Sequence, residues 1–137
     1  MIVKDVMSSH VATVNEQDTV SNAAEIMCRH DIGVLPVMKN GNKLVGMLTD
    51  RDIVLRCVAD KRDQENCKVG EIMTSTTLSI DPNKSLAEAL QMMSNHQVKR
   101  LAVTENGKLS GIVSLSDIAR IRSGAETAKA LCEISMP

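Results

Sequence analysis

The chain contains no phenylalanine, tyrosine or tryptophan among its 137 residues. Proteins that bind single-stranded nucleic acid usually stack bases on aromatic rings, so this absence counts against that function. The net charge is −1, from 16 basic and 17 acidic residues, which leaves no basic excess for a nucleic-acid partner. Without aromatic rings the core must be aliphatic, and nine methionines are available to fill irregular gaps.

Long apolar runs are also missing, so no segment of the sequence is expected to span a membrane. The first residues, Met1-Ile2-Val3-Lys4-Asp5, lack the apolar centre of a signal peptide. We therefore expect a cytoplasmic protein with no membrane partner.

The four cysteines form no Cys-x-x-Cys pair, and no histidine lies at zinc-finger spacing from a cysteine pair. They are Cys28, Cys57, Cys67 and Cys132. We expect reduced, buried or idle thiols and no metal site. A redox role for Cys57 and Cys67, which flank a charged segment, is the alternative.

Signatures of catalysis are absent from the sequence. It contains no nucleophile elbow, no phosphate-binding P-loop and no glycine run of a dinucleotide-binding fold. We expect a protein that binds rather than an enzyme, with no required cofactor.

What the sequence does have is a duplication. The segments Gly46–Ile53 and Gly111–Ile118 share the pattern Gly, two apolar residues, Thr or Ser, two variable residues, Asp, Ile. The match begins at Val3 and Val69, and one residue is lost in the turn that precedes these segments. The duplication predicts repeats at 1–58 and 67–122, a charged linker at 59–66 and a tail at 123–137.

Each repeat reads as β-α-β-β-α, which predicts a mixed α/β (α+β) fold of two repeats packed through their sheets with pseudo-twofold symmetry. An Asn-Gly turn joins the second and third strands of each repeat. The predicted strands are 11–14, 33–38 and 44–48 in the first repeat, and 77–80, 100–104 and 109–113 in the second.

The predicted helices follow the first and third strands. The first helix of each repeat carries an apolar stripe, and a capping box at Ser85–Glu88 precedes the second copy. The stripes are Val20, Ala23, Ala24 and Met27, then Leu86, Ala89, Leu90 and Met93. Further helices are predicted at 50–57 and 115–121, and a weak stripe of Ala125, Ala128, Leu131 and Cys132 predicts a helical tail.

Together these residues resemble a tandem pair of cystathionine β-synthase (CBS) domains, the Bateman module. The stretches that carry the resemblance are His30–Val37, Gly46–Val54 and His96–Leu101. They look like those of small stand-alone bacterial CBS-pair proteins, including the hypoxic-response type. The resemblance implies a regulatory sensor of AMP, ADP, ATP or S-adenosylmethionine. It also implies a homodimer that signals to another protein.

The resemblance implies two ligand clefts, each built from both repeats. Cleft A is Met47, Thr49, Arg51, Asp52, Thr77, Ser79, Lys99, Arg100 and Leu101; cleft B is Val11, Thr13, Gly33, Val34, Leu35, Ile112, Ser114, Ser116 and Asp117. A carboxylate at the end of the Thr/Ser-x-x-Asp pattern can accept both hydroxyls of a ribose. Lys99 and Arg100 favour cleft A as the phosphate site.

Two alternatives remain open from the sequence. The Thr/Ser-x-x-Asp segments also fit helix starts, although aspartate is a shorter reach than the glutamate of a usual capping box. The second interpretation of the whole chain is a ligand-free dimeric interaction or stress-response scaffold.

Overall fold

The computed structural model describes residues 1–75, 78–121 and 124–135, and the chain forms two compact units. The first-repeat unit is Ala12–Thr77. The second-repeat unit combines Met1–Val11 with Leu78–Pro137. Both units mix helices and strands, which confirms the predicted α/β class.

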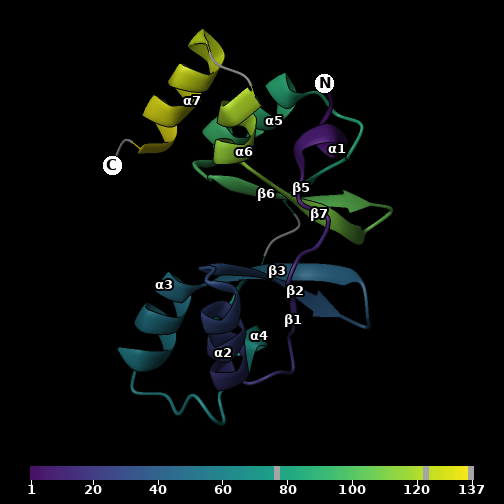
Figure 1. Ribbon diagram of the computed structural model, residues 1–137. Coiled ribbons are helices and arrows are strands. Elements are labelled where there is room, and N and C mark those ends of the chain that lie inside the picture. The colour runs from purple at the N-terminus through teal and green to yellow at the C-terminus, as the bar shows by residue number, and fades with distance from the viewer. Residues whose placement is uncertain (76–77, 122–123, 136–137) are drawn as a thin grey trace. The chain divides into compact units, whose positions relative to one another are not determined.

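The first-repeat unit is built on a short mixed sheet. β1 (Val14–Asn15) lies parallel to β2 (Val34–Lys39), and β3 (Lys43–Thr49) is antiparallel to β2 and to β4 (Thr74–Ser75). The unit's helices lie together on one side of this sheet (Figure 1). They are α2 (Val20–His30), α3 (Asp50–Ile53), the π-helical turn η1 (Val54–Val58) and α4 (Val69–Ile72).

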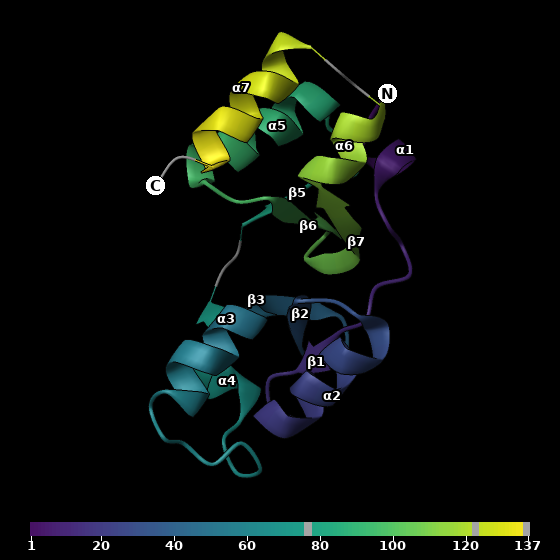
Figure 2. The same cartoon turned by 60° about the vertical axis from the view of Figure 1, so that its left-hand side comes forward.

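The second-repeat unit has the same plan. β5 (Ser79–Ile80) is parallel to β6 (Arg100–Glu105), which is antiparallel to β7 (Lys108–Ser114). Its larger helices lie on one side of that sheet, with α7 alongside α5 (Figure 2). The helices are α1 (Val3–Val6), α5 (Leu86–His96), α6 (Leu115–Ile121) and α7 (Ala125–Ser135).

The two predicted hairpin turns form as the sequence indicates. Asn40 and Gly41 have φ values of 50° and 88°, and Asn106 and Gly107 have values of 54° and 78°. Two consecutive residues in the left-handed region match the twist of the flanking strands, and Asn-Gly tolerates that conformation best. These turns fix the register that places Thr49 and Ser114 at the ends of their strands.

The helical stripes form the core of each unit. In α5 all four predicted stripe residues are buried, and in α2 three are, whereas Ala24 is exposed. The remaining place on the α2 face is taken by Ile26, which is partly buried against the same cluster. Ser85 accepts a hydrogen bond from the Glu88 backbone at 3.1 Å, but the Glu88 side chain pairs with Lys84 instead of closing the predicted capping box.

The leading segment of each repeat packs in the unit of the other repeat. Val3 of α1 is fully buried beside Ile80 and Leu86, and its backbone donates to the Lys84 carbonyl at 2.8 Å. Val69 of α4 is equally buried in the other unit. The compact units therefore divide the chain differently from the duplication, whose boundaries at 1–58 and 67–122 remain a prediction about the repeat.

The tail contains the predicted helix, α7, but the predicted stripe is not its buried face. Ala130 is 1% exposed and Ile134 packs against the core of the second-repeat unit. Ala128, Leu131 and Cys132 are exposed. The helix packs on α5 and α6 of its own chain. Across the described parts of the chain, no helix combines the length and apolar character needed to cross a bilayer.

Candidate functional site

Both Thr/Ser-x-x-Asp segments are reciprocal helix caps. The Asp52 backbone donates to the Thr49 hydroxyl at 3.0 Å, and the Asp52 carboxylate accepts from the Thr49 backbone at 3.0 Å. Ser114 and Asp117 repeat this exchange, at 3.1 Å in both directions. The shorter aspartate therefore does reach, and the helix-start alternative is a feature of the fold that still leaves carboxylate lone pairs for another partner.

The two capping aspartates differ in accessibility. The Asp52 side chain is 11% exposed and lies 3.6 Å from Nη1 of Arg56, which also donates to the Ile72 carbonyl at 3.0 Å. The Asp117 side chain is 19% exposed and pairs with Arg120, whose own side chain is 73% exposed. Both arginines also contact backbone, since Nε of Arg120 donates to the Ser116 carbonyl at 3.4 Å. Arg56 is the less exposed of the two, at 51%, so Asp117 and its partner are the more approachable pair.

A hollow of about 310 Å³ lies next to this second cap, entirely within the second-repeat unit. Its volume is at the lower end of the range of small-molecule sites, roughly 300–1,000 Å³. The β6–β7 register pairs Arg100 with Ser114, and the Leu115 backbone donates to the Lys99 carbonyl at 2.8 Å. The lining residues are Lys99, Arg100, Ser114, Leu115, Ser116, Ala119 and Leu131.

This hollow joins residues that the sequence analysis assigned to different clefts. Lys99 and Arg100 were predicted in cleft A, and Ser114 and Ser116 in cleft B. In the structure all four line one surface, and the two serine hydroxyls lie 3.0 Å apart. Two cations and two hydroxyls, with no acidic side chain among the lining residues, make an environment that favours an anion.

An equivalent hollow of about 320 Å³ lies on the first-repeat unit, lined by Asp50, Arg51, Val54 and Leu55. Asp50 corresponds in the duplication to Leu115, and Gly33 to Lys99. The Asp50 backbone donates to the Gly33 carbonyl at 2.9 Å, and a Cβ on Gly33 would lie 2.9 Å from the Asp50 carboxylate. The second repeat therefore has Lys99 at this position, whereas the first repeat has Gly33 with the Asp50 carboxylate next to it.

The remaining predicted residues that the structure describes line neither of these two hollows. Leu35 and Leu101 are core residues, 0% and 1% exposed, and the Ser79 hydroxyl accepts from Thr104 at 2.8 Å. Thr77 lies outside the described residues. The partly exposed remainder lies on strands or the segments that precede them: Val11, Thr13, Val34, Met47 and Ile112.

Two residues that line the hollow beside Ser114 were not predicted from the sequence. Ala119 lies one turn beyond Leu115 on α6, and its counterpart Val54 lines the other hollow, so the duplication could have predicted it. Leu131 comes from α7, which follows the duplication and has no counterpart in the first repeat. Only the packing of α7 against α6 brings it there.

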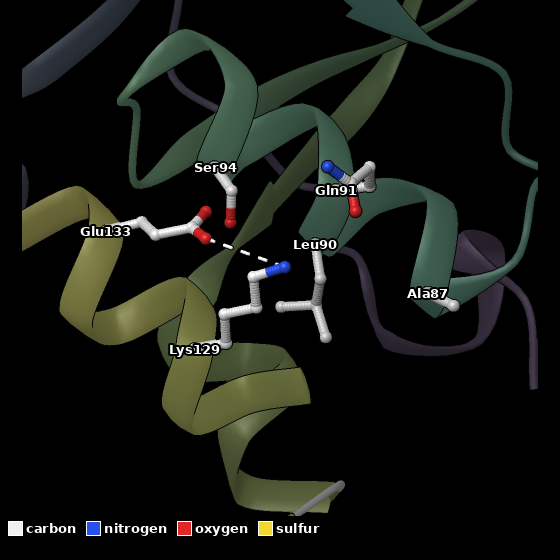
Figure 3. A pocket seen from close by; sticks show the side chains of 6 residues that line it. All are labelled: Ala87, Leu90, Gln91, Ser94, Lys129 and Glu133. Carbon is white, nitrogen blue, oxygen red and sulfur yellow. Dashed lines mark ion pairs between the residues drawn. The ribbon is translucent and has the colours of Figure 1, made fainter. Parts of the chain in front are cut away.

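A smaller hollow of about 170 Å³ lies between α5 and α7 (Figure 3). Lys129 and Glu133 reach toward α5 and pair with each other at 3.7 Å. The opposing wall is Ala87, Leu90, Gln91 and Ser94. Because its charges are already paired and its volume is about half that of the hollow beside Ser114, this groove is the weaker candidate. Among the described residues, no three His, Cys, Asp or Glu side chains come together as a metal would require.

The chain belongs to the CBS domain family. The family model matches twice, at residues 3–58 and 69–124. The chain is 44% identical over 134 residues to the CBS domain-containing protein YhcV of Bacillus subtilis, with 97% of this chain and 94% of that protein covered. The predicted membership of the tandem CBS pairs is confirmed.

Two solved structures are also similar. The crystal structure of Hypoxic Response Protein I with two coordinated zinc ions has a TM-score of 0.83 and 39% identity, covering 90% of this chain and 100% of that chain. The CBS domain pair of protein MJ0100 in complex with 5′-methylthioadenosine and S-adenosyl-L-methionine has a TM-score of 0.78 and 27% identity, covering 88% and 94%.

Proposed function

We propose that this protein is a regulatory sensor that binds an adenosyl compound, with the hollow beside Ser114 as the site of its phosphate-bearing part. The observation that carries the proposal is the meeting of Lys99, Arg100, Ser114 and Ser116 on one surface. Guanidinium and ammonium groups bind phosphate through charge-assisted hydrogen bonds, and serine hydroxyls add further donors. The adenosyl complex of the similar MJ0100 domain pair supports this ligand class.

Asp117 is the proposed ribose acceptor. Its carboxylate accepts from the backbone of Ser114, which lines the hollow, and among the described residues its other oxygen pairs only with the exposed Arg120. A ribose diol can replace that contact, because an exposed ion pair contributes little to stability and is readily exchanged. Asp52 is less suited, since Arg56 is tied to the backbone of α4 at its side.

Among the candidate ligands, the charges favour AMP, ADP or ATP over S-adenosylmethionine in this hollow. The two nearby cations attract phosphate and repel a sulfonium. The equivalent hollow on the first-repeat unit presents Asp50 beside Arg51, so it offers no net positive charge. We therefore propose that the two repeats bind ligands of different charge, the first repeat accepting the less anionic one.

The proposed output is a change in affinity for another protein or for a second copy of the chain. A ligand can shift such an equilibrium only by the difference in its affinity for the two states. Binding, rather than catalysis, is what the lining residues support: they supply hydrogen-bond donors and positive charge for holding an anion.

Calorimetric titration with AMP, ADP, ATP and S-adenosylmethionine tests this proposal. We expect Lys99→Gln/Arg100→Gln to weaken ATP binding roughly 10- to 100-fold, the loss that charge-assisted hydrogen bonds predict. The matched control, Lys43→Gln/Lys108→Gln, removes the same charge from two exposed hairpin positions and should bind normally. Asp117→Asn, which keeps an acceptor for the Ser114 backbone, should also weaken binding.

The opposite pattern contradicts the site assignment: Asp52→Asn abolishing ATP binding while Asp117→Asn leaves it intact. If none of the four ligands raises the melting temperature at millimolar concentration, the sensor proposal itself is wrong, since a ligand of the native state must stabilise it.

A ligand-free dimeric scaffold is the second candidate, and exposed apolar side chains favour it. Val54, Leu55 and Val58 on η1 are 54%, 49% and 62% exposed. Adjacent exposed apolar side chains of this kind are typical of interaction surfaces. A homodimer that buries these side chains needs no ligand. This candidate function predicts that none of the four ligands changes the melting temperature.

A further inference from the structure

Two thiols that the sequence separates by the charged linker meet inside the first-repeat unit. Cys57 on η1 is fully buried, and Cys67, just before α4, is 7% exposed. Both belong to the same core cluster, and each sulfur contacts Arg62. Buried cysteines are usually inert packing residues, so a chemical role needs more than their proximity.

Arg62 supplies the additional feature. Its Nη1 donates to the Cys67 sulfur at 3.3 Å, and its carbonyl accepts from the Cys57 thiol at 3.7 Å. Its backbone N–H donates to the Cys57 carbonyl at 2.9 Å, so the residue is held between the two cysteines. A guanidinium at the sulfur favours the thiolate, which is the reactive form of cysteine.

The two thiols therefore have different environments. The hydrogen bond with Cys67 raises the pKa of the Arg62 guanidinium, which keeps the positive charge beside that sulfur. Burial raises the pKa of the Cys57 thiol, and the neighbouring Cys67 raises it further, so Cys57 retains its proton. The Cys67 sulfur thus faces a guanidinium, whereas the Cys57 thiol faces a backbone carbonyl.

We propose that Cys67 and Cys57 form a dithiol switch that a peroxide oxidises to a disulfide, with Cys67 as the attacking sulfur and Cys57 as the resolving one. Cys67 is 7% exposed and Cys57 is 0% exposed, so a small oxidant meets the Cys67 sulfur first.

The chemistry balances with hydrogen peroxide as the oxidant. The Cys67 thiolate attacks one oxygen, an S–O bond forms, the O–O bond breaks, and the departing hydroxide takes a proton to become water. Cys57 then loses its proton and attacks the sulfenic sulfur, so the S–S bond forms and the S–O bond breaks. That hydroxide leaves with the Cys57 proton as a second water, and the two thiols have lost two electrons in total.

The disulfide would tie the end of η1 to the start of α4. Cys67 is already bonded to α2, since its carbonyl accepts from the Val20 backbone at 2.9 Å. Closing the ring also removes the thiol that the Arg62 guanidinium contacts, while its ion pair with Asp60 at 3.7 Å can persist. Oxidation thereby changes the mobility and the contacts of this segment, independently of any adenosyl ligand.

Peroxide treatment of a Cys28→Ser/Cys132→Ser background tests the switch, because that background removes the two exposed thiols. After alkylation and proteolysis without reductant, mass spectrometry should find peptides joined through Cys57 and Cys67, with the intact mass lower by two hydrogens. Dithiothreitol should reverse the change. On the same background, Cys57→Ala should accumulate a Cys67 sulfenic acid that dimedone traps, and Cys67→Ala should leave Cys57 unlabelled.

Arg62→Gln tests the positioning residue. It should slow the oxidation of Cys67 several-fold, whereas Arg29→Gln, which removes the same charge from the exposed end of α2, should not. A Cys67 that stays reduced at peroxide concentrations that oxidise Cys28 or Cys132 of the wild type overturns the proposal. Equal dimedone labelling of Cys57 in Cys67→Ala overturns the assignment of roles. Should an alanine variant fail to fold, the peptide map of the background protein and the Arg62→Gln rate still decide.

Discussion

Single side chains in this protein serve more than one purpose, and the capping aspartates show why the sequence left their role open. Asp52 and Asp117 close the start of a helix through reciprocal hydrogen bonds with Thr49 and Ser114. The same pattern supplies the proposed ribose acceptor. A sequence motif identifies the residue types, but only the arginine that faces each carboxylate distinguishes the approachable Asp117 from the restrained Asp52.

The buried Cys57 thiol predicts a pH dependence of stability that can be measured on reduced protein. Burial raises the pKa of this thiol above its ordinary value of 9.0. The unfolded chain therefore releases the Cys57 proton at lower pH than the folded chain does. Stability from this group is fully present below pH 9.0 and falls as the pH rises above it.

Urea unfolding from about pH 8 to about pH 10 should show this loss, since the ordinary thiol pKa lies in that window. We expect the free energy of unfolding to fall more steeply with pH in the wild type than in Cys57→Ala. The cavity in the variant lowers its stability by a constant amount, so only the slopes are compared. Parallel slopes for the two proteins would contradict the expected direction.

Strands and helices were predictable where the element is long enough to show turn residues or a repeated apolar spacing. The Asn-Gly hairpins and the eleven-residue helices α2 and α5 follow directly from turn chemistry and apolar spacing. The four-residue helices α1 and α4 were not predicted as helices, because one turn carries no period. In α7 the weakly apolar residues fit several faces, and contact with α5 selected Ala130 and Ile134 over the predicted stripe.

The glycine that begins each Gly-h-h-Thr/Ser-x-x-Asp pattern is explained by strand packing. Gly46 of β3 pairs with Ser75 of β4, and a Cβ there would lie 2.7 Å from both the Met73 sulfur and the Thr74 carbonyl oxygen. Gly111 of β7 faces the Ser8 carbonyl in the same way. The motif glycine is therefore needed because the leading segment of the other repeat packs too close for a Cβ, and not because a ligand binds there.

Substituting these glycines should destabilise the protein. Gly46→Ala or Gly111→Ala forces a methyl group against backbone oxygen, and overpacking of this kind costs about 1–3 kcal/mol. Gly33→Ala is the matched control: its Cβ would lie 2.9 Å from the Asp50 carboxylate, a side-chain end that can rotate away. Thermal unfolding should separate the two classes. A Gly33→Ala variant as unstable as Gly46→Ala would argue against backbone contact as the cause.

Across the whole chain, the duplication is expressed as an exchange of segments between the units. The sequence showed two copies, and the family model also matches twice, at 3–58 and 69–124. The sequence could not show that α1 packs with the second copy and α4 with the first. The apolar pattern of a leading segment is the same whichever copy it packs against. Those choices depend on long-range packing: Val3 shares one core cluster with Leu86, and Val69 shares the other with Val14.

This exchange predicts that a substitution in one repeat loosens the unit that contains the other. Val3 and Val69 are equivalent in the duplication and both fully buried, so each truncation should cost about 2 kcal/mol of apolar burial. In native-state hydrogen exchange, Val3→Ala should accelerate amide exchange in α5 and β7, whereas Val69→Ala should accelerate it in α2 and β2. Each variant is the control for the other. If Val3→Ala instead loosened α2 and β2, the leading segment would belong to its own repeat, and the division of the chain at Ala12 and Thr77 would be wrong.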